Sequence, residues 1–315
     1  DSMDTAQKVA DLAAREGIDL RVIGVPKTID NDVGDQEMDL LDHTPGYGST
    51  ARYWAYITQL LDEENRGMSP SEPVGVLQAM GRSAGFIPAA ARLADPDRTM
   101  PLQLYLPESE HTLESLGENV TRELSRSGRC MVIASEGFNV GSLGEKHDSF
   151  GHVEYGASRS TVAQKVINYL NDIGLPVRGQ ATGQLPGVLQ RCTSILASSV
   201  DLEEGYEVAQ HAVSLAAEGK SGVMASIRRR AGSEYSAYYD SIPLEVVANS
   251  HRGLPKHWLS EDQLDVTDDF IRYARPLIGE GWPEVELQRG LQRFARLTPV
   301  FVQKQLPAYV PEKHR

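Results

Sequence analysis

The 315-residue sequence has few cysteines and no excess of positive charge. Its two cysteines, Cys130 and Cys192, stand alone without a CxxC pair, which excludes a disulfide framework and gives no support to a zinc site. Lysine and arginine number 31 against 44 aspartate and glutamate, and the resulting net charge of −13 argues against binding to nucleic-acid backbones or anionic membranes. An anionic substrate stays compatible with this charge, because a few local basic side chains can reverse the field inside a cleft.

Long hydrophobic runs are also lacking. The longest apolar run, 74–80, is far shorter than the ~20 residues of a membrane span and suits a buried strand. No signal peptide is visible, and we expect a soluble, cytoplasmic protein. The chain opens Asp1-Ser2-Met3-Asp4 without an initiator methionine, and a helical pattern begins at once, so we expect that an upstream segment is missing.

What the sequence does contain is an alternation of short apolar runs and amphipathic helical patterns. The predicted strands cover 20–25, 74–79, 102–106, 130–134 and 222–227, and the predicted helices lie between and before them. Repeated strand–helix units with short connections predict an α/β fold with a mostly parallel, doubly wound sheet. From about residue 238 prolines become frequent, and we interpret this part as a wrapping tail with a possible part in oligomer formation.

Polar motifs follow three of the predicted strands, where ligands of parallel sheets bind. In the first motif, at 26–32, a lysine and a threonine precede Asp30 and Asp32. An extended loop would place both carboxylates on the same side of the backbone, where one could take a proton while the other holds a cation or water. Composition alone favours a simpler interpretation, a solvated turn with side-chain caps.

Four segments together resemble the signature motifs of the phosphofructokinase family. They are VIGVPKTIDND at 22–32, AMGRSAGF at 79–86, ASEG at 134–137 and LPGVLQR at 185–191, in the family's order and at family-like spacing. The resemblance implies two Rossmann-like lobes with mostly parallel sheets. The donor lobe would comprise 1–43 and about 193–315, without its N-terminal part, and the fructose 6-phosphate lobe would comprise 44–192.

The resemblance also implies a role for each motif residue. Asp30 would take the proton from the 1-hydroxyl of fructose 6-phosphate, Thr28 would contact substrate and phosphate, and Asp32 would support the base or the water shell of Mg²⁺. The residues implied to grip the sugar phosphate are Met80, Gly81, Arg82, Glu136 and Arg191, with Arg178 reaching into a neighbouring subunit's site. Without the resemblance, Arg82 and Arg191 would be ordinary charges at helix starts and Glu136 a solvated cap.

Two places in the sequence bear on the phosphoryl donor. Asp1 and Ser2 align with the end of the family's donor-binding GGD turn, where the Asp1 carboxylate would exclude the α-phosphate of ATP by repulsion. Lys27 stands where typical bacterial ATP enzymes have glycine, and it would supply a point charge to the shorter pyrophosphate. Both features resemble the pyrophosphate-dependent 6-phosphofructokinase branch.

The implied activity is phosphoryl transfer from pyrophosphate to fructose 6-phosphate with Mg²⁺, a glycolytic and gluconeogenic step, in a homo-oligomer (a dimer or a tetramer). The family's main metal ligand would lie upstream of residue 1. An ATP-dependent 6-phosphofructokinase is the first alternative, because some eukaryotic ATP-type enzymes share PKTIDND. A non-catalytic sugar-phosphate-binding subunit is the second, although such a subunit has no chemical need for Lys27, Asp30 and Asp32.

Overall fold

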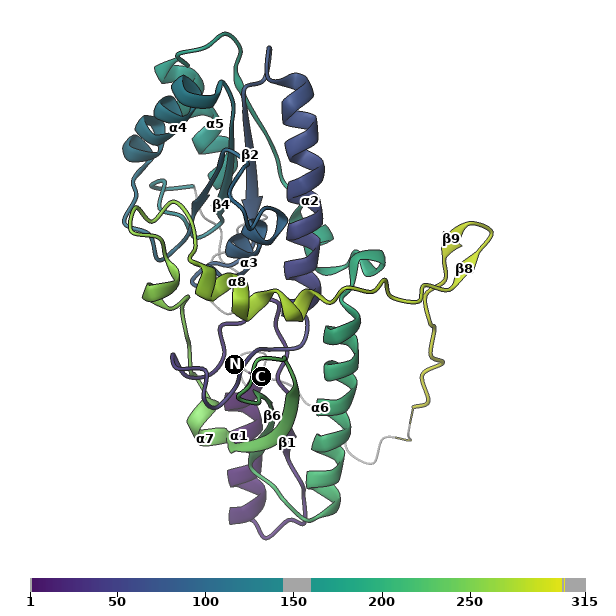
Figure 1. Ribbon diagram of the computed structural model, residues 1–315. Coiled ribbons are helices and arrows are strands. Elements are labelled where there is room, and N and C mark those ends of the chain that lie inside the picture. Colours follow the sequence, from purple (N-terminus) through teal and green to yellow (C-terminus); the bar gives the residue numbers. More distant parts are fainter. Residues whose placement is uncertain (1, 144–159, 302, 304–315) are drawn as a thin grey trace. The chain divides into compact units, whose positions relative to one another are not determined.

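The computed structural model describes residues 2–143, 160–301 and 303. The chain divides into two units, residues 1–283 and residues 284–315. The smaller unit contains an antiparallel hairpin of β8 (Leu287–Gln288) and β9 (Leu291–Gln292) (Figure 1). Every predicted site residue falls within the larger unit, and of these residues only Asp1 lies outside the described part of the chain.

The first sheet of the larger unit is parallel, with the strand order β3–β4–β2–β5. Its strands are β2 (Val74–Ala79), β3 (Leu102–Tyr105), β4 (Cys130–Ser135) and β5 (Ala181–Gln184). Every residue of β4 is buried, as expected of a central parallel strand covered on both faces. The pairing of β2 with β4 brings the ends Ala79 and Ser135 opposite each other, so the two polar motifs that follow these strands start side by side.

Helices cover both faces of this sheet (Figure 1). They are α2 (Tyr47–Met68), α3 (Phe86–Ala89), α4 (Leu113–Ser127) and α5 (Val162–Ile173), with a 3₁₀ turn at Ala90–Ala94. One core packs α2 against one face, for example Trp54 with Leu77 and Ile133. A second core packs α4 and α5 against the other face, for example Val120 and Val166. The α/β class predicted from the alternating pattern is confirmed.

The second sheet is mixed, with the order β1–β6–β7. In it β1 (Ile23–Gly24) runs parallel to β6 (Val223–Arg229), which pairs along its whole length with the antiparallel β7 (Ala237–Pro243). The helices of this part are α1 (Ser2–Arg15), α6 (Ser199–Ala217) and α7 (Leu244–Val247). A strand was predicted over 20–25, but only Ile23 and Gly24 of this range form one, β1.

The segment after residue 238 is more than the predicted wrapping tail, because its part up to Pro283 supplies core residues of the larger unit. Besides β7, it supplies α8 (Asp268–Ala274) and 3₁₀ turns at Lys256–Trp258 and Pro276–Ile278. Trp258, Phe270 and Tyr273 belong to the core that faces α2, with the rings of Trp258 and Tyr273 4.7 Å apart. Within the described part of the chain, none of the helices has the length and apolar character of a membrane span.

Candidate active site

The motif at 26–32 forms a bent loop after β1. The Thr28 hydroxyl accepts a hydrogen bond from the backbone N–H of Asp30 at 3.1 Å and donates one to the Asp30 carboxylate at 3.3 Å. Asn31 is fully buried and has φ 57°, in the left-handed region that asparagine tolerates better than most residues. The loop is not extended as predicted, because the backbone turns at Asn31, between Asp30 and Asp32.

Four charged side chains, one from each of the four motifs, lie close enough for the two arginine charges to act on the pKa of both carboxyls, and we refer to them as the acceptor cluster: Asp30, Arg82, Glu136 and Arg191. Burial raises the pKa of the Asp30 carboxyl above its ordinary value, and the neighbouring Asp32 charge adds to this, while Arg82 and Arg191 oppose it. Burial also raises the pKa of Glu136 to about 7, against the opposing charge of Arg82, whose Nε lies 4.0 Å from Oε1 of Glu136.

The loops after β2 and β4 approach each other so closely that only glycine fits between them. The Ser135 hydroxyl donates to the carbonyl of Gly81 and accepts a 2.9 Å bond from the backbone N–H of Gly137. A Cβ atom added at Gly137 would lie 1.8 Å from the carbonyl oxygen of Arg82. This contact fixes the position of Arg82 relative to Glu136.

We predict that Gly137→Ala lowers kcat/KM for fructose 6-phosphate about 10²-fold, because a misplacement near 1 Å in a binding site has that effect. Steady-state kinetics measure it. Gly67→Ala is the matched control, since a Cβ there meets no atom within 4 Å. Equal kinetics for the two variants would contradict the role assigned to the contact.

Glu136 gives a pH-dependent prediction. Its pKa is raised from 4.5 to about 7, so the folded state holds a proton that the unfolded state releases, and stability is lost as the pH rises through this window. Glutamine has no proton to release in this range, so the Glu136→Gln variant does not lose stability in this way. The free energy of unfolding of the variant, relative to the unmodified chain, should therefore rise by about 2–3 kcal/mol between pH 4.5 and about pH 8. Urea unfolding at several pH values across this range measures the free energy of unfolding of both chains, and Glu118→Gln, at an exposed position, is the control. A difference between the Glu136→Gln variant and the unmodified chain that does not depend on pH would contradict the burial of this charge.

Gln190 is a site residue that the sequence interpretation missed. Its buried side-chain carbonyl accepts hydrogen bonds from the backbone N–H of Met80 and from the indole of Trp54, both at 3.0 Å. Its amide donates to the carbonyl of Gly187 at 2.8 Å. The Met80 N–H is therefore engaged within the protein, and Gln190 holds the neighbouring Arg191 close to the loop after β2. Gln190 stands in the motif at 185–191, so the motif could have pointed to it, but only its burial and hydrogen bonds show what it holds.

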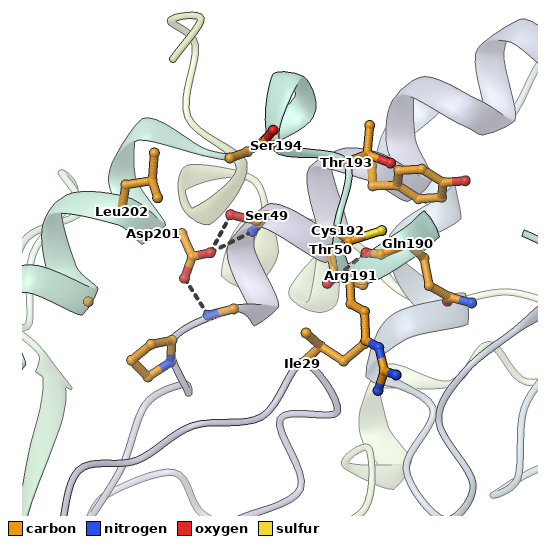
Figure 2. A pocket seen from close by; sticks show the side chains of 15 residues that line it. Ile29, Ser49, Thr50, Gln190, Arg191, Cys192, Thr193, Ser194, Asp201 and Leu202 are labelled. Atoms are coloured by element: carbon orange, nitrogen blue, oxygen red, sulfur yellow. Dashed lines mark hydrogen bonds between the residues drawn. The ribbon is translucent and has the colours of Figure 1, made fainter. Parts of the chain in front are cut away.

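Arg191 also lines a cavity of about 460 Å³ together with Ile29, which precedes Asp30 in the chain. Figure 2 shows its side chain extending away from Ser194 and toward Ile29. Across the cavity, Asp201 at the start of α6 accepts hydrogen bonds from the backbone N–H of Gly46 at 2.7 Å and of Ser49 at 3.0 Å (Figure 2). Asp201 thus caps α2 in place of a residue of that helix.

A second cavity, of about 280 Å³, lies on the donor side of the loop, and we call it the donor cavity. Predicted donor and catalytic residues share its wall, namely Ser2, Lys27, Thr28 and Asp32. Asn249 and Ser250 line it as well, and Nδ1 of His251 lies 3.8 Å from the Asp32 carboxylate; the sequence interpretation missed this segment. Asp30 is not part of this wall, but it is linked to it through Thr28.

Arg178 is exposed and has no contact with the acceptor cluster that the structure records. The role assigned to Asp1 falls outside the described residues. Among residues 2–143, 160–301 and 303 no group of three or more histidine, cysteine, aspartate or glutamate side chains is placed to hold a metal ion. The donor cavity offers one carboxylate, that of Asp32, which fits an ion that takes most of its ligands from water and phosphate, as Mg²⁺ does.

Comparisons with known proteins identify the family and the fold of the chain. The family model described as Phosphofructokinase matches residues 1–216. A pyrophosphate--fructose 6-phosphate 1-phosphotransferase of Xanthomonas campestris pv. campestris is 36% identical over 98% of this chain and 73% of its own length. One of Halomonas elongata is 33% identical, with 98% and 72% covered. The crystal structure of a pyrophosphate-dependent phosphofructokinase from Nitrosospira multiformis has 32% identity and a TM-score of 0.85 over 98% of this chain and 73% of that one.

Proposed function

The chain belongs to the phosphofructokinase family, and we propose that it transfers a phosphoryl group from pyrophosphate to the 1-hydroxyl of fructose 6-phosphate. The products are fructose 1,6-bisphosphate and phosphate. The observation that carries the proposal is that the bent loop contributes Asp30 to the acceptor cluster and Lys27, Thr28 and Asp32 to the donor cavity. Thr28 links the two, since it lines the donor cavity and its hydroxyl bonds to Asp30.

On the acceptor side, Asp30 is the general base. Its carboxylate takes the proton of the 1-hydroxyl as the oxygen attacks phosphorus, and the O–P bond forms as the bridging P–O bond of pyrophosphate breaks. The raised pKa of Asp30 makes it a stronger base than an exposed carboxylate, which favours proton transfer near neutral pH. Arg191 and Arg82 supply the positive charge that a sugar phosphate needs, and Glu136 accepts hydrogen bonds from its hydroxyls.

On the donor side, the protein's task is to position and neutralise charge, because phosphoryl transfer passes through a loose transition state. The Lys27 ammonium is the positive charge on the wall of the donor cavity and would bind the transferring group. Asp32 would orient the water shell of Mg²⁺, and the bound ion would neutralise charge on the pyrophosphate oxygens.

We extend the proposal to the lobes and the assembly. The mixed sheet and α1 draw on residues before 43 and after 193, and the parallel sheet draws on residues between them, which supports a donor lobe and a fructose 6-phosphate lobe. Residues of 254–278 pack in the core that faces α2, which favours the fructose 6-phosphate lobe for this segment over the predicted donor lobe of 1–43 and about 193–315. The exposed guanidinium of Arg178 supports a homo-oligomer in which it completes a neighbour's site.

A coupled assay that follows fructose 1,6-bisphosphate tests the activity with pyrophosphate and with ATP as separate donors. We expect turnover with pyrophosphate that exceeds turnover with ATP. Turnover with ATP alone would replace the proposal by the ATP-dependent alternative, and fructose 6-phosphate binding without turnover from either donor would favour the non-catalytic subunit.

A further inference from the structure

Arg252 lies fully buried beneath the bent loop and is not explained by any of the roles above. Its Nε donates to the carbonyl of Asn31 at 2.8 Å and its Nη2 donates to the Asn31 side-chain oxygen at 2.7 Å. The same guanidinium donates to the carbonyls of Leu41 and Asp42, the latter at 3.0 Å, and lies over the ring of Phe86. All these acceptors are neutral, and burial lowers the pKa of Arg252. Burying a charge among neutral acceptors costs free energy of folding. We therefore expect the contribution of Arg252 to lie in the local geometry that its hydrogen bonds impose.

The geometry that Arg252 imposes is the left-handed backbone conformation of Asn31. Besides its bonds to Arg252, the Asn31 side chain accepts from the backbone N–H of Thr44 at 3.1 Å and donates to the Tyr273 hydroxyl at 2.8 Å. The Tyr273 hydroxyl in turn donates to the carbonyl of Asp42 at 2.9 Å. Both ends of the Asn31 amide are therefore fixed, and the residue cannot relax into an extended conformation without breaking several buried hydrogen bonds.

A further set of hydrogen bonds holds Asp42, whose carbonyl accepts from both Arg252 and Tyr273. The Asp42 carboxylate accepts two 3.0 Å bonds from Arg229 and lies 2.8 Å from Nδ1 of the buried His43. Arg229 also donates to the backbone carbonyl of Tyr273 at 3.0 Å. These bonds hold the carbonyl of Asp42 in the position that both Arg252 and Tyr273 require.

We infer that Arg252 is a positioning residue for catalysis, which holds the bend at Asn31 so that Asp30 joins the acceptor cluster while Asp32 faces the donor cavity. Its contacts lie on both sides of the bend, since its backbone N–H donates to the carbonyl of Asp32 at 2.8 Å. In an extended loop the side chains of residues 30 and 32 would point to the same side. The guanidinium thus holds a turn between the proton acceptor and the carboxylate on the donor cavity wall, and Arg252 does not itself line that cavity.

The inference rests on the proposed function, so its experiment has one arm that needs no turnover. In Arg252→Lys the positive charge is kept but the planar set of donors is lost. We expect kcat with pyrophosphate to fall about 10²-fold, as for a reacting group displaced by about 1 Å, with an unchanged calorimetric Kd for fructose 6-phosphate. Hydrogen–deuterium exchange of residues 28–34 should become faster, whether or not the enzyme turns over.

Arg92→Lys is the matched control for the loss of a buried arginine. Arg92 is 2% exposed and its partners are Asp95, Asp265 and the carbonyl of Leu102, away from the bent loop. It should lower the melting temperature but leave kcat and the exchange of 28–34 unchanged. A purely structural role for Arg252 would make the two variants behave alike.

If Arg252→Lys does not fold, Tyr273→Phe tests the inference instead, because this change removes only one hydroxyl from the hydrogen-bond network around Asn31. It should lower kcat about 10-fold and speed exchange in 28–34, because the hydroxyl makes two buried hydrogen bonds, one from Asn31 and one to Asp42. A folded Arg252→Lys with unchanged kcat or unchanged exchange would overturn the inference, as would unchanged values for both in Tyr273→Phe. If the unmodified enzyme shows no turnover with pyrophosphate, the proposed function fails, while the exchange measurements still decide whether Arg252 holds the loop.

Discussion

Asp30→Asn is expected to lower kcat with pyrophosphate and fructose 6-phosphate by about 10²–10⁴-fold, the usual loss when a general base is removed. The change keeps the size of the side chain and its hydrogen bond to Thr28, so the loop keeps its shape. It also removes a negative charge beside Arg82 and Arg191. The sugar phosphate is an anion, so calorimetry should show that the variant binds fructose 6-phosphate at least as tightly as the unmodified chain.

The control for this prediction is Asp39→Asn, an exposed aspartate in the segment that follows the loop. It should leave kcat and binding unchanged. The pH profile adds an independent check, because the activity that depends on the ionised Asp30 is lost as the pH falls through its raised pKa, and this acid limb should vanish with asparagine. Loss of fructose 6-phosphate binding together with loss of kcat would instead assign Asp30 a structural role.

The sequence predicted the elements whose hydrophobic pattern is continuous. The strand β2 was expected at its observed bounds, because a compact apolar run leaves few alternatives. The strand β7 was missed, since its residues AYYDSIP are partly exposed and end in proline. Its position depends on pairing with β6 across the sheet, which no local pattern records.

The sequence motifs contain the candidate residues that bear charges at the site. Residues whose role depends on burial were missed. Nε of Arg82 lies 4.0 Å from Oε1 of Glu136, and the charge of Arg191 opposes the rise in the pKa of Glu136 that burial causes, while the roles that the resemblance implied for these residues stay predictions. Arg252 could not be found in this way, because an arginine in the polar stretch HRGLPKH has the sequence signature of a surface charge. The bend at Asn31 was equally hidden, since its left-handed backbone depends on Arg252 and Tyr273, which lie more than 200 residues away in the chain.

Lys27→Met is expected to lower kcat/KM for pyrophosphate by about 10²–10³-fold, the loss typical of removing one positioned charge donor. Methionine keeps most of the length of the side chain in the wall of the donor cavity but leaves the cavity with the carboxylate of Asp32 and no ammonium. A dianionic or more highly charged donor then meets net repulsion there. We expect no compensating gain with ATP, because removing the charge creates no binding surface for a nucleotide.

Lys220→Met is the matched control, as it removes an exposed ammonium just after α6 and should not change the kinetics. Salt dependence sharpens the test. A Lys27 ammonium that binds the donor makes pyrophosphate use sensitive to ionic strength, and the Lys27→Met variant should lose most of that sensitivity. Equal kcat/KM for pyrophosphate in the two variants would show that the donor's charge is neutralised elsewhere, and Lys27 would then have no part in the choice of pyrophosphate over ATP.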